Sequence, residues 1–285
     1  MTKIAIISDL HANIDALNIT LKDIEKRNVD KIICLGDLVT KYFYPREVVD
    51  AVRQNADLIL KGNCDDLVVN NENYRFARAK LGLERIEYLD SLPLQEQIMV
   101  NKVLVNLYHS TPESLEEMFN PLQDNSRTSY KDREMLDYRK MFFSSEPQIS
   151  FVGHTHQDFV GIEKDHKLDL QDKTKTIVLS DKMRAIVNVG SVGENSKLVE
   201  KNGDYFTQIN SYLTYVIVDD KNLNNGFSVE IIKIPYKDTL KNVYFDMIKL
   251  QKEKNAPYSP NDTKKVRDSL LYMGIDETEL EKKGR

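Results

Sequence analysis

The chain has 285 residues, of which 41% are hydrophobic and 30% are charged. This length suits one large domain or two small ones, and the composition excludes the intrinsically disordered and collagen-like classes. The net charge of −5 at pH 7 disfavours a protein that binds nucleic acid mainly through phosphate contacts, since such proteins are usually basic.

The first part of the chain alternates strand and helix patterns. Residues 3–8 are a short β-branched run that predicts a buried strand, and the apolar residues of 14–27 recur at helical spacing. Residues 31–35 and 56–63 predict two further buried strands, each of which ends in a glycine-containing turn. Strands and helices in alternation are typical of a parallel sheet, and ligands bind at the carboxyl ends of its strands.

The rest of the chain predicts more strands and helices. In chain order, the patterns predict helix and loop over 66–95, two strands over 97–110 with a turn at Asn101-Lys102, a helical connecting layer over 110–146, and a buried strand over 147–156. Short alternating strands from 157 to 235 predict a second, mainly antiparallel sheet that faces the first. Helical spacing returns over 239–275, before a polar tail. We expect one domain over 1–285, of the α/β class.

Polar side chains follow the predicted strands, so we expect them to lie at the same edge of the predicted parallel sheet. Seven of these side chains are potential metal ligands: Asp9, His11, Asp37, Asn63, His109, His154 and His156. Each motif alone also fits an ordinary helix cap or turn, so the inference depends on the ordered set. Imidazole, carboxylate and amide ligands without a thiolate suit Mn, Fe, Zn, Ni or Co rather than Ca. Seven ligands suit two divalent ions that share one carboxylate.

The ordered set resembles the calcineurin-like metallophosphoesterase superfamily. The motifs that carry the resemblance are Asp9-x-His11, Gly36-Asp37, Gly62-Asn63, His109 and Gly153-His154-Thr155-His156. The resemblance covers residues 4 to about 193, and the part up to about 275 is similar to the small bacterial and archaeal phosphodiesterase-type branch. It implies two packed mixed β-sheets flanked by helices, in a four-layer sandwich.

The resemblance also implies the role of each site residue. Asp9, His11 and His156 hold the first ion, Asn63, His109 and His154 hold the second, and Asp37 bridges them. Mn is the foremost candidate metal. A hydroxide held between the ions attacks phosphorus, so that Asp37, Asn63 and His109 form the catalytic centre. Around them, Ser191 and the backbone of Gly190 support the loops, and Asp65 or Asp66 orients the imidazoles.

The chain departs from the superfamily beside two of its motifs. Where members often carry a leaving-group histidine after Gly-Asn, this chain has Cys64. After Asp37 it has Leu38-Val39-Thr40-Lys41 instead of the Asp-Arg-Gly of the protein-phosphatase branch, so the guanidinium clamp is absent. These departures disfavour a protein Ser/Thr phosphatase and a dinucleoside polyphosphatase of that branch. Ser110 replaces a glycine after His109, which is a small change.

Together these features predict a metal-dependent phosphoesterase that acts on a small substrate, with phosphodiesters preferred to alkyl phosphomonoesters. Two alternatives stay open: a nuclease of the same fold, and a catalytically inactive metal-binding or scaffold protein. The first apolar run is too short for a signal peptide, and no stretch approaches the ~20 apolar residues of a membrane span, so we expect a cytoplasmic protein without a membrane partner. The sequence leaves the physiological substrate, the native metal and homo-oligomer formation open.

Overall fold

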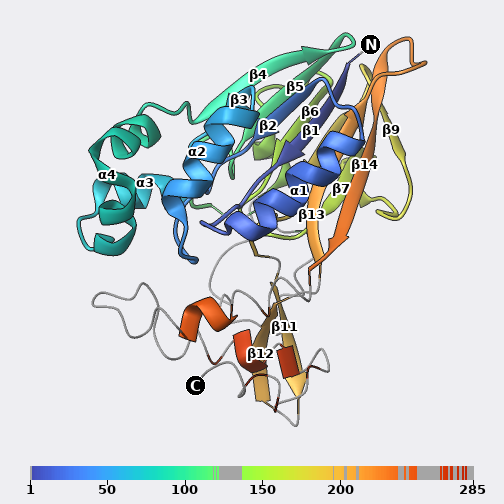
Figure 1. Cartoon of the computed structure of the whole chain (residues 1–285). Helices are drawn as coiled ribbons and strands as arrows, with labels where there is room; N and C mark the ends of the chain where they lie inside the picture. Colours follow the sequence, from blue (N-terminus) through green and yellow to red (C-terminus); the bar gives the residue numbers. More distant parts are fainter. Residues whose placement is uncertain are drawn as a thin grey trace.

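The computed structural model describes residues 2–117, 119, 121, 137–194, 196–201, 204–209, 212–236 and scattered positions between 241 and 280. Two mixed six-stranded sheets form its centre (Figure 1). The first has the strand order β3-β2-β1-β13-β14-β9. Its strands are β1 (Lys3–Ile7), β2 (Lys31–Cys34), β3 (Leu58–Ile59), β9 (Ile177–Ser180), β13 (Tyr212–Asp219) and β14 (Gly226–Pro235).

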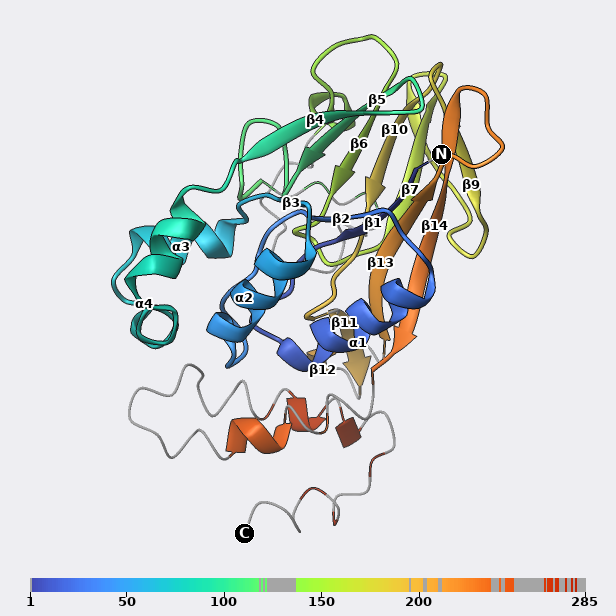
Figure 2. The same cartoon turned by 45° about the horizontal axis from the view of Figure 1, so that its top comes forward.

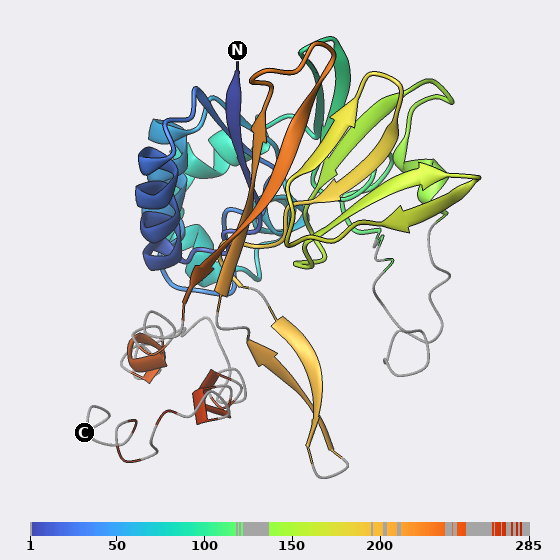
Figure 3. The ribbon, with the colours of Figure 1, turned by 90° about the vertical axis from the view of Figure 1, so that its right-hand side faces the viewer.

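The second sheet has the order β4-β5-β6-β10-β7-β8 and packs on one face of the first (Figure 2). Its strands are β4 (Gln95–Val100), β5 (Val103–Tyr108), β6 (Gln148–Val152), β7 (Phe159–Lys164), β8 (Lys167–Leu170) and β10 (Arg184–Asn188). A separate hairpin of β11 (Ser196–Lys201) and β12 (Asp204–Ile209) lies beyond the lower end of the first sheet in Figure 3.

Helices cover the other face of the first sheet, as the side view in Figure 3 shows. They are α1 (Ile14–Lys26), α2 (Pro45–Asn55), α3 (Asn63–Asn70) and α4 (Arg75–Asp90). In the segment 137–147, which includes a short 3₁₀ helix (Tyr138–Met141), Met141 and Phe142 pack with Val152 and Ile186 of the second sheet. The expectation of two packed mixed sheets flanked by helices is therefore confirmed.

Alternation along β1 explains why both faces of the first sheet are buried. Ile4 and Ile6 pack in the core between the two sheets, whereas Ala5 and Ile7 pack under the helices. Successive side chains of a strand point to opposite faces, so a run that is apolar throughout suits a strand covered on both sides. On the helix side, α1 buries Leu17 against the same cluster as Ile7.

Several predicted elements differ from the structure. The expected third strand over 56–63 has only two paired residues, Leu58–Ile59. The described part of 110–146 contains one 3₁₀ turn rather than a helical layer, and most of 118–136 lies outside the described residues. The predicted helix over 239–275 and the polar tail also fall largely outside them, although 244–248 are helical.

The assignment of strands to sheets also differs from the expectation of a parallel sheet facing a mainly antiparallel one. Strands β5 and β6 pair in parallel within the second sheet, and β6 pairs in parallel with β10. Strand β13 pairs antiparallel with β1 in the first sheet, and β14 and β9 extend that sheet. Both sheets are therefore mixed, and each places the carboxyl ends of parallel strands at a common edge.

Candidate metal centre

Two loops of the first sheet carry three of the predicted ligands. The Asp9 amide donates to the Gly36 carbonyl at 3.0 Å, and the His11 amide donates to the Asp37 carbonyl at 2.9 Å. Asp9, His11 and Asp37 all have a left-handed backbone, with φ between 49° and 56°. Such a backbone costs a non-glycine residue about 1–3 kcal/mol, so the packing of the two loops must hold it.

Asn63 enters the site as the first residue of α3, not as the end of a strand. The glycines before it and before Asp37 bring the two loops together. A Cβ on Gly62 would lie 2.2 Å from the Asp37 nitrogen, and one on Gly36, where φ is 105°, would lie 2.5 Å from the Gly62 nitrogen. Only glycine permits this approach, which places the Asn63 side chain beside Asp37.

Loops of the second sheet carry the other three ligands. His109 follows β5, and both His154 and His156 follow β6. The Gly153 amide donates to the His109 carbonyl at 2.9 Å, which joins the loops after β5 and β6. The His154 amide donates to Asp9 Oδ2 at 3.0 Å, and this bond joins the two sheets at the site. The site is therefore built from both sheets, not from one sheet edge as the sequence analysis predicted.

One group of side chains gathers around Asp9. His11 Nε2 lies 2.8 Å from His156 Nε2. Asp9 Oδ1 lies 3.3 Å from His156 Nε2 and 3.9 Å from His11 Nε2. All three residues are buried. One ligand atom of each residue lies within 4.8 Å of those of the other two, which is close enough for the three to share a metal ion.

A second group gathers around Asn63. Its Oδ1 lies 3.0 Å from His109 Nε2 and 3.0 Å from His154 Nδ1. Asp37 lies between the two groups, with Oδ1 at 3.4 Å from His109 Nε2 and Oδ2 at 3.8 Å from His11 Nε2. Each oxygen of this carboxylate therefore faces a histidine of a different group.

Four of these distances, between 3.0 and 3.4 Å, fit the coordination shells of metal ions. Ligand bonds of about 2.1 Å place neighbouring ligand atoms about 3.0–3.4 Å apart in octahedral and tetrahedral shells. His109 Nδ1 lies 3.0 Å from the Leu35 carbonyl and donates to it, so Nε2, which lies 3.0 Å from Asn63 Oδ1, is the nitrogen that can bind a cation once it has lost its proton. Asp9 Oδ1 is buried without a hydrogen-bond donor among the described residues. A buried carboxylate oxygen without a donor suits a position beside a cation.

The pKa values also favour metal binding. Burial, with Lys41 and His156, lowers the pKa of His11 to about 3, and burial, with His109, lowers that of His154 to about 4. Both imidazoles are neutral at pH 7, which leaves a lone pair free for a metal. Burial also lowers the pKa of His109, but the carboxylates around it outweigh burial and raise it above the usual value. Burial alone would raise the pKa of Asp9, but the surrounding histidines lower it far below its ordinary value.

Two further residues hold the ligand loops from behind. Asp65 is buried and accepts backbone bonds from Gly62 at 2.9 Å, Leu38 at 2.9 Å and Val39 at 3.2 Å. The Ser191 hydroxyl donates to the Asp9 carbonyl at 3.0 Å. Asp66, the other carboxylate considered from the sequence, instead faces Asn70 at 2.9 Å on the outer side of α3.

Removal of the Asp65 carboxylate should destabilise the protein. In Asp65→Ala, three buried amides lose their acceptor, and each unsatisfied group costs about 1–3 kcal/mol. We expect the free energy of unfolding to fall by about 3 kcal/mol or more, measured by urea denaturation of the metal-free protein. The matched variant Asp66→Ala should change it by less than about 1 kcal/mol, because that side chain is 43% exposed. Equal effects of the two variants would contradict this role of Asp65.

Two further residues act on the surroundings of the site: Cys64, which the sequence analysis named, and Lys41, to which it gave no role. The Cys64 sulfur lies within 4.8 Å of ligand atoms of His11 and Asp37. Together with burial, the positive charge of Lys41 lowers the pKa of His11, so this lysine acts on the same region. Its place four residues after Asp37 was the available signal, but the left-handed loop that turns it back could not be predicted.

Comparisons with known proteins identify the family and the fold of the chain. Residues 2–207 match the family described as the calcineurin-like phosphoesterase superfamily domain. The uncharacterized protein MJ0912 of Methanocaldococcus jannaschii is 30% identical over 259 residues, which cover 86% of this chain and 92% of that protein. In the described residues no helix is long and apolar enough to cross a membrane.

Two solved structures share the fold. A metallophosphoesterase from Sphaerobacter thermophilus superposes with a TM-score of 0.62 at 22% identity, covering 94% of this chain and 99% of that one. The hypothetical protein PH1004 from Pyrococcus horikoshii OT3 gives a TM-score of 0.61 at 20% identity, covering 90% and 96%. Since the matched family segment spans more than half of the sequence, the chain belongs to the calcineurin-like phosphoesterase superfamily.

Proposed function

We propose that the protein hydrolyses small phosphodiesters with the help of two divalent transition-metal ions, of which Mn²⁺ is the first candidate. The observation that carries this proposal is the position of Asp37 between two groups of ligands. One oxygen faces His109 and the other faces His11. A carboxylate so placed suits a bridge between two ions, and two-ion sites are typical of phosphoryl-transfer enzymes.

Each residue of the site has a proposed role. Asp9, His11 and His156 hold one ion, while Asn63, His109 and His154 hold the other, and Asp37 bridges them. When bound, the ions supply Lewis-acid activation of water and of the phosphoryl oxygens. The Leu35 carbonyl fixes the tautomer of His109 through Nδ1, and Ser191 holds the backbone of Asp9.

Besides the oxygen that would bind a metal ion, the Asn63 side chain carries a hydrogen-bond donor. Its Nδ2 faces Cys64 Sγ at 3.9 Å, on the side of the site where the thiol lies. The Nδ2 group therefore offers a hydrogen bond to a non-bridging oxygen of the substrate as charge develops there. The amide supplies a ligand and a donor in one side chain, which a carboxylate at this position could not do.

A panel of esters tests the proposed function. The Mn²⁺-loaded protein should hydrolyse bis-p-nitrophenyl phosphate faster than an alkyl phosphomonoester, and it should leave single- and double-stranded DNA intact in a gel assay. Cleaved DNA would instead show a nuclease. If elemental analysis shows two bound ions but no ester turns over, the protein is a metal-binding or scaffold protein and the proposal is wrong.

Metal binding should release protons near neutral pH. The neighbouring carboxylates raise the pKa of His109 although burial opposes them, and burial and Asp37 raise the pKa of Asp65 to about 7. These groups hold protons in the metal-free protein and lose them when cations bind, so metal affinity should rise with pH through neutrality. His11 and His154 add none, since they are neutral already.

Titration calorimetry in two buffers of different ionisation enthalpy counts these protons. We expect a net release of about one proton or more per chain at pH 6.5. Asp65→Asn removes one of the titrating groups and should lower the count. Net proton uptake by the wild type would contradict the assignment of His109 as a ligand.

The residue at position 64 should control how the enzyme responds to the leaving group. Burial and Asp37 raise the pKa of the Cys64 thiol well above its usual value, so the thiol is neutral and is a weak donor. An imidazolium in its place could protonate a departing alkoxide. Cys64→His should therefore accelerate the hydrolysis of esters with poor leaving groups more than that of aryl esters, by up to ~10²–10⁴-fold.

The measurement is kcat/KM against the pKa of the leaving group for wild type and Cys64→His. Cys64→Ser is the matched control, because a hydroxyl is also neutral at this pH. Its line should stay parallel to that of the wild type. Parallel lines for all three proteins would mean that position 64 has no acid role.

A further inference from the structure

One turn of the second sheet carries a proposed ligand of each ion. Gly153, His154, Thr155 and His156 follow directly after β6. The Thr155 amide donates to the Gly153 carbonyl at 2.7 Å, which closes a γ-turn around His154. The φ of His154 is 64°, and that of His156 is 59°. A γ-turn with a positive φ at its centre is rare and strained, so groups outside the turn must hold it.

The side chain of Asn188 holds both ends of this turn. Asn188 is the last residue of β10, which pairs in parallel with β6 (Figure 2), and its side chain is completely buried. Its Nδ2 donates to the Gly153 carbonyl at 2.9 Å and to the Thr155 hydroxyl oxygen at 2.9 Å. These two acceptors come directly before and directly after His154 in the chain. One amide group therefore spans the strained residue.

The other polar atom of Asn188 fixes the orientation of its amide. Oδ1 accepts a hydrogen bond from the Gly190 amide at 3.0 Å. A backbone N–H only donates and a backbone carbonyl only accepts, so Oδ1 and Nδ2 cannot exchange places. The Val189 amide donates to the Val152 carbonyl at 2.9 Å, which holds the chain of Asn188 beside β6. Aspartate and leucine have nearly the same shape, but neither can make all three bonds.

We infer that Asn188 is a positioning residue of the metal centre, which keeps the imidazole of His154 turned toward Asn63 and His109. The inference rests on the proposed function, because it takes His154 as a ligand, and it extends that proposal to a residue that touches no ion. His154 Nδ1 lies 3.0 Å from Asn63 Oδ1 in the closed turn. Without the Asn188 amide, the turn can relax toward the negative φ that residues other than glycine prefer, and the imidazole moves with it.

The two ions should not depend equally on Asn188. Its hydrogen bonds flank His154 directly, whereas they reach His156 only through the intervening backbone. Affinity for the ion of the second group, which His154 would share with Asn63 and His109, should therefore fall more than affinity for the first.

A purely structural role of Asn188 leads to a different expectation. If the side chain only stabilised β10, its removal would loosen the fold and weaken metal binding whether or not His154 is present. If it acts through His154, its removal should have no further effect once that imidazole is gone. A double-mutant cycle separates the two cases, because residues that act through one another give non-additive effects.

The cycle consists of wild type, Asn188→Ala, His154→Ala and the double variant, each titrated metal-free with Mn²⁺ in a calorimeter. The wild type should bind two ions, and His154→Ala should weaken one of the two binding constants. Asn188→Ala should weaken the same constant by about tenfold to a hundredfold, as is typical when a residue behind a ligand is removed. The double variant should bind Mn²⁺ as weakly as His154→Ala alone.

Thr155 offers a milder test of the same contact. Thr155→Val keeps the shape of the side chain but removes the acceptor of one Asn188 bond, so it should weaken the same constant by less than Asn188→Ala. Thr155→Ser keeps the hydroxyl and should retain the affinity of the wild type. The cycle can be repeated with Thr155→Val in place of Asn188→Ala, which gives an answer even if Asn188→Ala does not fold.

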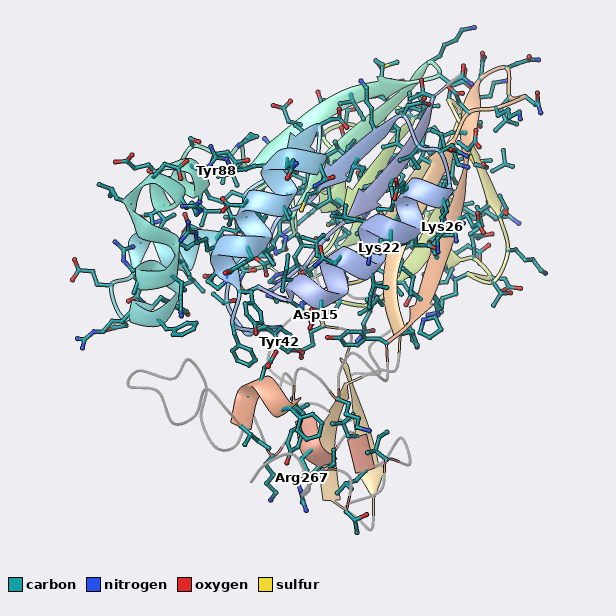
Figure 4. All side chains as sticks on the ribbon, in the orientation of Figure 1. Asp15, Lys22, Lys26, Tyr42, Tyr88 and Arg267 are labelled. Carbon is teal, nitrogen blue, oxygen red and sulfur yellow. The ribbon has the colours of Figure 1, made fainter. Side chains whose placement is uncertain are left out.

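Asn106→Ala is the matched control, because Asn106 is an equally buried asparagine of the second sheet. Its Nδ2 donates to the side chains of Gln148 and Ser150 rather than to a ligand loop. This variant should unfold at lower urea concentration and still bind both ions with constants near those of the wild type. Lys22→Ala changes an exposed side chain of α1 (Figure 4) and gives the scatter of the measurement.

The outcomes separate this inference from the proposed function. Unchanged Mn²⁺ affinity in Asn188→Ala, or the same fold loss with and without the His154 imidazole, would overturn the role of Asn188 and leave the two-ion phosphodiesterase standing. If His154→Ala binds both ions as tightly as the wild type, His154 is not a ligand, and the proposed arrangement of the site fails together with this inference.

Discussion

Exhaustive chelation should abolish the hydrolysis of bis-p-nitrophenyl phosphate, and Mn²⁺ should restore it. The expected loss is complete, because no other group among the described residues replaces two cations at the phosphoryl oxygens. The purified protein should hold close to two transition-metal ions per chain before chelation. Ca²⁺ should not restore activity, since the imidazole-rich ligand set suits transition metals, whereas Ca²⁺ prefers oxygen ligands.

Stability should fall together with activity. Asp9 and Asp37 are buried, and Asp9 Oδ1 has no hydrogen-bond donor among the described residues. Removing the cations leaves Asp9 Oδ1 with His156 as its neighbour at 3.3 Å and Asp37 Oδ2 with His11 at 3.8 Å, while backbone amides bond only the other oxygen of each carboxylate. Because ions bind the folded chain far better than the unfolded one, thermal unfolding should shift to lower temperature after chelation and return with Mn²⁺. Full activity in a sample shown by elemental analysis to be free of metal would refute the two-ion mechanism.

The local patterns of the sequence predicted the elements that lead into the site. The uniformly apolar run before Asp9 predicted β1, and the helical spacing after it predicted α1. The turn at Asn101-Lys102 was predicted as well, and both residues have the positive φ that a tight hairpin turn requires. The spacing of apolar residues and the residue types of a turn are local properties, so they can be recognised in a single sequence without an alignment.

The pairing of distant strands could not be predicted in the same way. Strand β13 pairs with β1 although more than two hundred residues separate Val218 from Ile4. An apolar strand that is buried on both faces fits either sheet, so its pattern does not choose between them. The length of β3 could not be predicted either, because the apolar pattern over 56–63 does not reveal that only two residues pair and that α3 begins at Asn63.

The seven predicted ligands show the same difference between what local sequence and what tertiary packing determine. Their order along the chain indicated a shared site, and the structure brings them together. Their orientation depends on a left-handed backbone at five of them: Asp9, His11, Asp37, His154 and His156. Nothing in their own residue types demands that conformation, which costs free energy and persists only because the loops of both sheets hold one another.

Asp37→Asn should produce the largest loss of any single substitution in the site. Both oxygens of Asp37 are used: Oδ1 faces His109 at 3.4 Å and Oδ2 faces His11 at 3.8 Å. An amide keeps the shape of the side chain but replaces one oxygen by an NH₂ group, which has no lone pair for a cation. It also removes the negative charge that lies between two positive ions. One substitution therefore weakens both metal positions.

Substitutions that affect one ion should cost less. His11→Ala and His156→Ala each remove a ligand of the first group only, so the second ion and the bridge remain. We expect Asp37→Asn to lower kcat/KM by ~10³ or more, which corresponds to about 4 kcal/mol of transition-state stabilisation. Each histidine variant should lose less than this. Metal content should follow the same order, with the greatest loss in Asp37→Asn.

The conservative change Asp66→Asn provides the matched control for Asp37→Asn. It makes the same chemical replacement on the first turn of α3, but the Asp66 side chain is 43% exposed and faces Asn70 rather than the site. Its kcat/KM and metal content should stay near those of the wild type. Circular dichroism should show all variants folded, so that a loss of rate reflects the site. If Asp37→Asn keeps two ions and a rate near that of the wild type, Asp37 does not bridge the ions, and the arrangement of ligands proposed for this site is wrong.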